Sequence, residues 1–166
     1  MFFVGRHYIP FSSAGVLTYL IARRLPRAAS ACYRPRMDLI QPYILVFVGA
    51  GLGGALRHTL NLAIGRALGL GFPWATAFIN VSGSTAMGFL IGWLAFRSGA
   101  GWTQSVRLFV ATGVLGGYTT FSTFSLESIL LLERGQIGAA IAYVGGSVLL
   151  GIVGLWGGLS LARALT

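Results

Sequence analysis

Long apolar segments alternate with short polar connections along most of this 166-residue chain. From Pro42 onward there are four such segments, at about residues 43–64, 74–96, 105–132 and 137–161. Each is close to the ~20 residues that a helix needs to cross a bilayer. The connections between them are short, which favours antiparallel neighbouring helices. The pattern therefore predicts an all-α membrane protein with four transmembrane helices.

The third apolar segment contains a run that suits a helix poorly. Glycines at 113, 116 and 117 precede five hydroxyl side chains and two phenylalanines, in the order Thr119, Thr120, Phe121, Ser122, Thr123, Phe124 and Ser125. Glycine and β-branched residues are weak helix formers, and irregular backbone at membrane depth is tolerated only where it lines a cavity or is buried in protein. We expect the third helix to be broken at mid-membrane. The alternative is a kinked helix whose hydroxyls bond to its own carbonyls.

A break of this kind exposes groups that bind ions. Freed main-chain carbonyls coordinate cations, and Ser and Thr hydroxyls donate hydrogen bonds to anions. Phe121 and Phe124 are three residues apart, so they share a helix face. The positive edge of a phenyl ring meets an anion without a full charge. The run therefore points to ion conduction, although isolated phenylalanines more often face lipid or core.

Polar side chains inside the other apolar segments are further candidates. Asn80 lies in the middle of the second segment, either as a pore-lining donor or as an interhelical contact. Arg57 is a functional candidate because a guanidinium within a span is costly; it either forms a basic vestibule or reaches the membrane interface. Glu127 is the sole acid deep in a predicted span. We expect it to bond the hydroxyls of the break or a helix end of a partner.

Composition excludes several classes of protein. The chain is 55% hydrophobic and only 9% charged, whereas about a quarter of the residues in soluble domains are charged. All twelve basic residues are Arg and the net charge is +9. These Arg are not gathered into a nucleic-acid-reading module, so no nucleic-acid partner is expected. Neither a carboxylate pair nor a nucleophile with an evident base points to an enzyme.

Residues 1–36 differ from the rest of the chain, because they hold six of the twelve Arg and no acid. A transit peptide fits this composition, and a signal peptide fits it poorly. A third interpretation, which we favour, is that Met37 is the true start. The domains are then a basic N-terminal extension, 1–36, which is disordered or a mis-assigned start, and a four-helix channel domain, 37–166.

The reason for favouring Met37 is electrostatic. Counted from Met37, one side of the membrane would hold three Arg and the other two or three, which is almost no orienting bias. Such a chain can insert either way up, and an antiparallel homodimer becomes possible. Small residues at four-residue spacing, such as Gly49 and Gly53, recur on every predicted helix and allow close packing. We expect some of these stripes to face a partner subunit.

Three stretches resemble the CrcB/Fluc family of bacterial fluoride channels. They are residues 53–57 (GGALR), 80–83 (NVSG) and 116–125 (GGYTTFSTFS), of which the last is long and specific. Tyr143 and Ser147 also stand where the fourth helix of the family carries pore-facing hydroxyls. Gly151 departs from the family, some members of which have a serine there. The resemblance covers about 37–166 and nothing in 1–36.

The resemblance implies a dual-topology antiparallel homodimer with two fluoride pores. A structural Na⁺ would lie at the dimer interface, held by the backbone carbonyls of Gly116 and Thr119. Residues of the second, third and fourth helices would form the fluoride pore: Asn80, Phe121, Ser122, Thr123, Phe124, Tyr143 and Ser147. Arg57 would form the vestibule. The helix break would be supported by Gly113, Gly117, Thr120 and Glu127.

The expected function is passive export of fluoride across the bacterial inner (plasma) membrane, which relieves fluoride toxicity. A small multidrug-resistance-type exporter is the main alternative, since it also has four helices and dual topology. It needs a membrane-buried acid in its first helix, and residues 43–64 contain none. A non-transporting membrane anchor is a second alternative, and it gives no reason for Asn80 or the Thr/Ser/Phe run.

Overall fold

The computed structural model describes residues 40–96 and 100–165, and every element within them is helical. Three helices are long and apolar enough to cross a membrane: α2 (Ile40–Leu68), α3 (Trp74–Ala95) and α7 (Ile137–Ala164). They coincide with the first, second and fourth predicted segments, and α2 and α7 extend a few residues beyond them. The predicted all-α fold is thus confirmed for this part of the chain. The predictions for residues 1–36 lie outside it.

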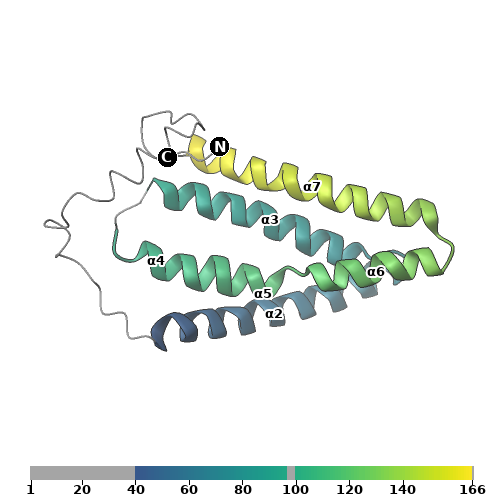
Figure 1. Ribbon diagram of the computed structural model, residues 1–166, viewed down its shortest axis with the longest axis horizontal. Helices are drawn as coiled ribbons and strands as arrows, with labels where there is room; N and C mark the ends of the chain where they lie inside the picture. Colours follow the sequence, from purple (N-terminus) through teal and green to yellow (C-terminus); the bar gives the residue numbers. More distant parts are fainter. Residues whose placement is uncertain (1–39, 97–99, 166) are drawn as a thin grey trace, which may run out of the picture. The chain divides into compact units, whose positions relative to one another are not determined.

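The third predicted segment is built from several short elements (Figure 1). A helical stretch begins with α4 (Thr103–Val106), continues as the π-helix η1 (Arg107–Leu115) and ends with α5 (Gly116–Tyr118). Two residues, Thr119 at φ −80°, ψ 158° and Thr120 at φ −150°, ψ 120°, are extended. Helix then resumes as α6 (Phe121–Glu133). The predicted interruption is present.

The position of the break corrects the sequence-based expectation. Gly113, Gly116 and Gly117, which we expected to interrupt the helix, all lie within helical turns. At Gly113 and Gly117, neighbouring backbone lies too close for a side chain. A Cβ on Gly113 would lie 2.9 Å from the Cα of Gly49, and one on Gly117 would lie 2.8 Å from the Cα of Ala50. The glycines therefore allow η1 and α5 to pack against α2, and the break comes after them.

Small residues serve the same purpose between α3 and α7. A Cβ on Gly88 would lie 2.9 Å from the carbonyl carbon of Leu155, and one on Gly158 would lie 2.8 Å from the backbone nitrogen of Phe89. Gly92 likewise meets the side chain of Ala162 at 2.8 Å. These four-residue stripes are used within one chain, where close backbone approach maximises van der Waals contact.

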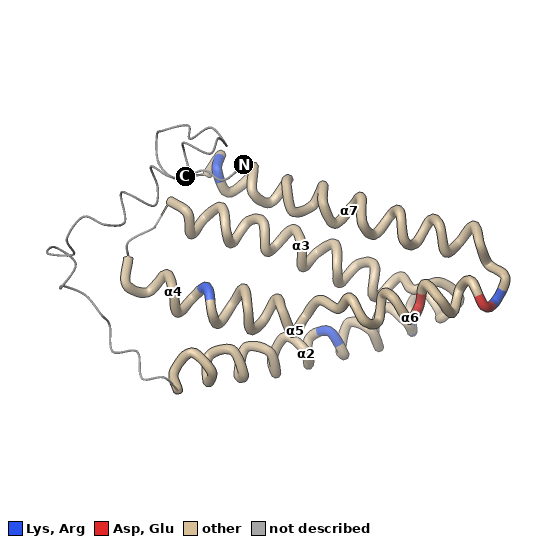
Figure 2. Tube along the Cα trace, in the orientation of Figure 1, with Lys and Arg blue, Asp and Glu red and all other residues tan. Residues whose placement is uncertain are grey.

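Buried residues are few and lie on either side of the break. One cluster joins Ile79 of α3 to Leu115 and Tyr118 before the break. The other joins Leu131 of α6 to Ala140 and Tyr143 of α7. Many large apolar side chains are exposed, including Phe47 (80%), Phe121 (79%) and Trp156 (67%). Long stretches of α2, α3 and α7 carry no charge (Figure 2), so these helices offer an apolar surface that suits a bilayer or a partner chain.

Candidate ion-conduction site

The side chain of Asn80 clamps the extended segment between α5 and α6. Its Nδ2 donates to the carbonyl oxygen of Thr120 at 3.0 Å, and the N–H of Thr120 donates to its Oδ1 at 2.9 Å. The amide thus pairs with both the N–H and the C=O of one residue, as a neighbouring strand would. These two bonds stabilise the extended backbone. Without them, the N–H and C=O of Thr120 would lack hydrogen-bond partners, because this residue is not part of a helix.

The break leaves main-chain carbonyls of the last turn before it without their helical donors. In an unbroken helix, the N–H of Thr120 donates to the carbonyl of Gly116, four residues earlier. Here that N–H is bonded to Asn80. In the same way, the N–H of Thr123 donates to the side-chain oxygen of Thr120 at 3.3 Å rather than to the carbonyl of Thr119. The carbonyls of Gly116 and Thr119, the pair that sequence resemblance nominated for Na⁺, are among those that the break leaves without a helical donor.

The hydroxyls of the break divide into two groups. Those of Thr119 and Ser125 bond back to carbonyls four residues earlier, of Leu115 and Phe121, at 3.0 and 2.9 Å. The Thr120 hydroxyl instead caps α6 and lies 3.3 Å from Ser122 Oγ and 3.0 Å from Thr123 Oγ1. Some hydroxyls of the run thus bond to carbonyls of their own helix, as the alternative interpretation expected. The helix is nevertheless broken.

A pocket of about 310 Å³ adjoins the break. Uncharged residues of α3, α6, α7 and the break line it, among them Asn80, Ser84, Thr119, Thr120, Phe121, Phe124 and Ser147. Ser147 Oγ is buried and has no hydrogen-bond partner in the described part of the chain. The rings of Phe121 and Phe124 lie 5.7 Å apart. The pocket thus combines an unpaired hydroxyl with aromatic rings and contains no charge that would fix an ion permanently.

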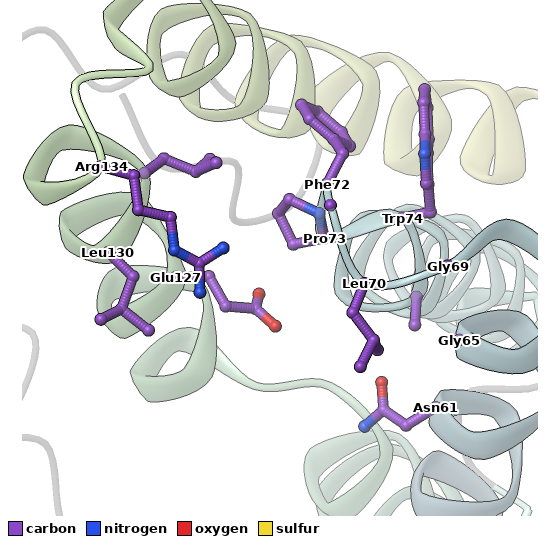
Figure 3. Close-up of a pocket in the computed structure, with 13 residues that line it drawn as sticks. Asn61, Gly65, Gly69, Leu70, Phe72, Pro73, Trp74, Glu127, Leu130 and Arg134 are labelled. Carbon is purple, nitrogen blue, oxygen red and sulfur yellow. The ribbon is translucent and has the colours of Figure 1, made fainter.

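A second pocket, of about 350 Å³, lies between the α2–α3 connection and the C-terminal half of α6. Figure 3 shows the carboxylate of Glu127 pointing into it, with Arg134 extending beside it. That carboxylate accepts hydrogen bonds from Thr76 Oγ1 at 3.0 Å and from the Tyr143 hydroxyl at 2.7 Å. Glu127 thus contacts hydroxyls of α3 and α7, in place of the hydroxyls of the break that we expected from the sequence.

Tyr143 lies between the two pockets. Its side chain is 1% exposed, and its ring lies 5.2 Å from that of Phe124 and 5.7 Å from that of Phe72. Phe124 lines the first pocket and Phe72 lines the second. A row of packed aromatic rings, Phe124, Tyr143 and Phe72, therefore separates the two pockets.

Removing the hydroxyl of Tyr143 is expected to destabilise the fold. Tyr143→Phe leaves one oxygen of the half-buried Glu127 carboxylate without its 2.7 Å donor, and a hydrogen bond to a charged group contributes about 1.5–3 kcal/mol. We expect a lower melting temperature in detergent. Tyr43→Phe, at a side chain that is 77% exposed, is the matched control. Equal melting temperatures for the two variants would contradict this assignment.

Residues 44–159 match the family model described as CrcB-like protein, Camphor Resistance (CrcB). The chain belongs to the CrcB family. Curated relatives named fluoride-specific ion channel FluC include a Beijerinckia indica protein, 60% identical over 74% of this chain and 97% of its own length. A Rhodopseudomonas palustris relative is 57% identical over 75% of this chain and 98% of its own. A Hyphomonas neptunium relative is 50% identical over 74% and 96%.

The CrcB-family motifs come together around the break. The segment 80–83 of α3 lies directly against residues 118–120, and Ser147 of α7 faces the same pocket. Arg57, by contrast, lines neither pocket. The Ser84 hydroxyl lies near Gly151, the residue at which the sequence departs from the resemblance. A Cβ placed on Gly151 would be 3.7 Å from Ser84 Oγ.

Sequence reasoning missed two contributors to the site. Thr76, 1% exposed, was overlooked because a threonine within an apolar helix is unremarkable until its partner is known. Ser82 bonds Tyr118 at 2.9 Å, although it stands within a motif that we had singled out for Asn80. Its partner lies 36 residues away in sequence, so the contact becomes visible only once α3 and α5 are packed.

Proposed function

We propose that this chain is a fluoride-selective channel that passively exports fluoride across the bacterial inner (plasma) membrane. Its high identity to proteins named fluoride-specific ion channels supports this function. The observation that carries it is the uncharged pocket at the helix break, where a buried Ser147 hydroxyl has no partner. A small, hard anion that accepts strong hydrogen bonds is the ligand that such a hydroxyl lacks.

Transport follows from the chemistry of the ion. Fluoride enters cells as HF at acid external pH, ionises inside and is trapped as the anion. A pore lets it leave down its electrochemical gradient without an energy source. Selectivity over chloride comes from a narrow route in which Asn80 and Ser147 offer hard donors and Phe121 and Phe124 offer ring edges. A larger anion gains less from these donors and needs more space.

The working assembly in this proposal is an antiparallel homodimer of four-span subunits. The broken segment, α4 to α6, is the third of these four spans in chain order. Phe121 is 79% exposed in the single chain although it lines the pocket, so a second copy would complete the wall. Among described residues, Arg66 and Arg134, with Arg57 near them, would lie on one side of the membrane and Arg107 and Arg163 on the other. This small difference supports dual topology.

A structural Na⁺ fits the freed carbonyls of Gly116 and Thr119. No group of three or more His, Cys, Asp or Glu that could hold a metal occurs within the described residues, and carbonyl oxygens suit a hard cation. Two carbonyls from each copy would make a four-oxygen site at the dimer interface. When bound, the ion would neutralise the facing carbonyl dipoles and hold the two breaks together.

Fluoride efflux from liposomes tests the proposal. Purified protein reconstituted into vesicles loaded with fluoride and chloride should release fluoride rapidly, as a fluoride electrode reports, and retain chloride. A multidrug exporter predicts proton-coupled transport of organic cations instead, and a membrane anchor predicts no flux. Vesicles that hold fluoride as well as protein-free controls do would contradict the channel.

Removing the Ser147 hydroxyl is expected to slow fluoride without harming the fold. No hydrogen bond is lost in the free chain, because Ser147 Oγ has no partner there. A hydrogen bond to a charged group contributes about 1.5–3 kcal/mol, so Ser147→Ala should lower fluoride flux about tenfold or more. Thr59→Val, which removes a hydroxyl bonded to its own helix at Ala55, should keep wild-type flux. Equal flux in both variants would reject Ser147 as a fluoride ligand.

A further inference from the structure

Ser82 and Tyr118 form a second bridge between α3 and the segment before the break. Ser82 Oγ and the Tyr118 hydroxyl oxygen are 2.9 Å apart. The Ser82 hydroxyl donates to the carbonyl of Ile79 at 3.2 Å, so Tyr118 is the donor in the bridge. Tyr118 is only 7% exposed. A buried tyrosine hydroxyl is costly without a partner, and Ser82 supplies it.

The two bridges connect α3 to both sides of Thr119. Asn80 and Ser82 are two residues apart on α3, and their partners Thr120 and Tyr118 are two residues apart across the break. Thr119 lies between the two anchored residues. Gly83 makes room for this arrangement, because a Cβ there would lie 3.1 Å from Tyr118 Cδ1. The backbone at Thr119 is thus held from both ends.

We propose that Ser82 and Tyr118 are positioning residues that set the direction and spacing of the Gly116 and Thr119 carbonyls, and so the cation affinity of the break. The inference rests on the proposed function, since those carbonyls are its Na⁺ ligands. Tyr118 lies between them in sequence. Its ring is packed against Ile79 and Leu115, and its hydroxyl bond prevents the ring and the adjoining peptides from turning. Asn80 fixes the far end alone.

Cation affinity should respond to each half of the bridge in a distinct way. Ser82→Ala leaves the Tyr118 hydroxyl buried without an acceptor, whereas Tyr118→Phe leaves Ser82 bonded to Ile79. Loss of one hydrogen bond corresponds to a change in Na⁺ affinity of about threefold to tenfold. We expect the Na⁺ concentration for half-saturation to rise about tenfold in Ser82→Ala and about threefold in Tyr118→Phe. The double variant should be no worse than Ser82→Ala.

The test titrates Na⁺ against full-length protein purified and reconstituted in potassium salts. One readout is the Na⁺-dependent rise in melting temperature in detergent, since a ligand stabilises the state that binds it. The other is fluoride efflux from liposomes at each Na⁺ concentration. At saturating Na⁺, each variant should regain most of the wild-type flux. Tyr43→Phe, which removes an exposed hydroxyl, should leave the half-saturating concentration unchanged.

The outcomes separate this inference from the channel itself. A bridge that only stabilises the fold predicts lower melting temperatures at every Na⁺ concentration with an unchanged half-saturation point, and that result overturns the inference. So does a wild-type protein without any Na⁺-dependent stabilisation. Wild-type protein that binds Na⁺ with variant shifts as expected, but releases no fluoride, supports the positioning role and contradicts the channel.

Discussion

Asn80→Asp is expected to abolish fluoride flux while leaving the assembled protein intact. The aspartate carboxylate can still accept from the Thr120 N–H. It has no donor to replace Asn80 Nδ2, which bonds the Thr120 carbonyl at 3.0 Å in the wild type. Two oxygens then face each other, which costs about 1–3 kcal/mol. The added negative charge also repels an anion in the adjoining pocket. Together these effects should lower flux at least about 100-fold.

The measurement is fluoride efflux from liposomes, with oligomeric state checked by size-exclusion chromatography in detergent. Asn61→Asp is the matched control, because it makes the same change in α2, at the second pocket and outside the pocket at the break, and should retain far more flux. Phe121→Ile removes a ring edge from the pocket without adding charge and should also suppress flux. Fluoride release at wild-type rates by both Asn80→Asp and Phe121→Ile would reject our assignment of the pore.

Gly53→Ala is expected to have the largest effect on folding, although alanine is the better helix former. A Cβ at Gly53 would meet the Val114 carbonyl oxygen and lie 2.8 Å from the backbone nitrogen of Tyr118. These are backbone atoms, so α2 must move away from the broken helix. Overpacking of this kind costs about 1–3 kcal/mol, more than the roughly 1 kcal/mol gained from helix propensity. Displacement of Tyr118 would also disturb the break.

The neighbouring Gly54 is the matched control. Nothing lies within 4 Å of a Cβ placed there, so Gly54→Ala should gain helix propensity at no steric cost. Thermal unfolding in detergent should therefore move in opposite directions for the two variants, with Gly53→Ala melting lower than wild type and Gly54→Ala melting at the same temperature or higher. A Gly53→Ala protein as stable as Gly54→Ala would show that α2 does not pack as described.

Much of the site was predictable because its residues are close together in sequence. The run 116–125 concentrates glycines, hydroxyls and phenylalanines, and local propensity alone argues against a regular helix there. The structure places Phe121, Phe124 and Thr120 around one pocket with Asn80 and Ser147. The partners of Glu127 were not predictable, since Thr76 and Tyr143 come from two other helices and neither looks unusual in its own segment.

The sequence by itself determined the helical class, the apolar segments and the presence of an interruption, because hydropathy, segment length and helix propensity are properties of consecutive residues. Only the tertiary structure decided where the helix breaks. Glycine is a weak helix former, yet Gly113 and Gly117 stay helical because α2 lies against them. The chain departs from the helix at Thr119 and Thr120 because Asn80, some forty residues earlier, captures the peptide N–H and C=O there. A side chain from another helix can compete for those groups only once the two helices are packed.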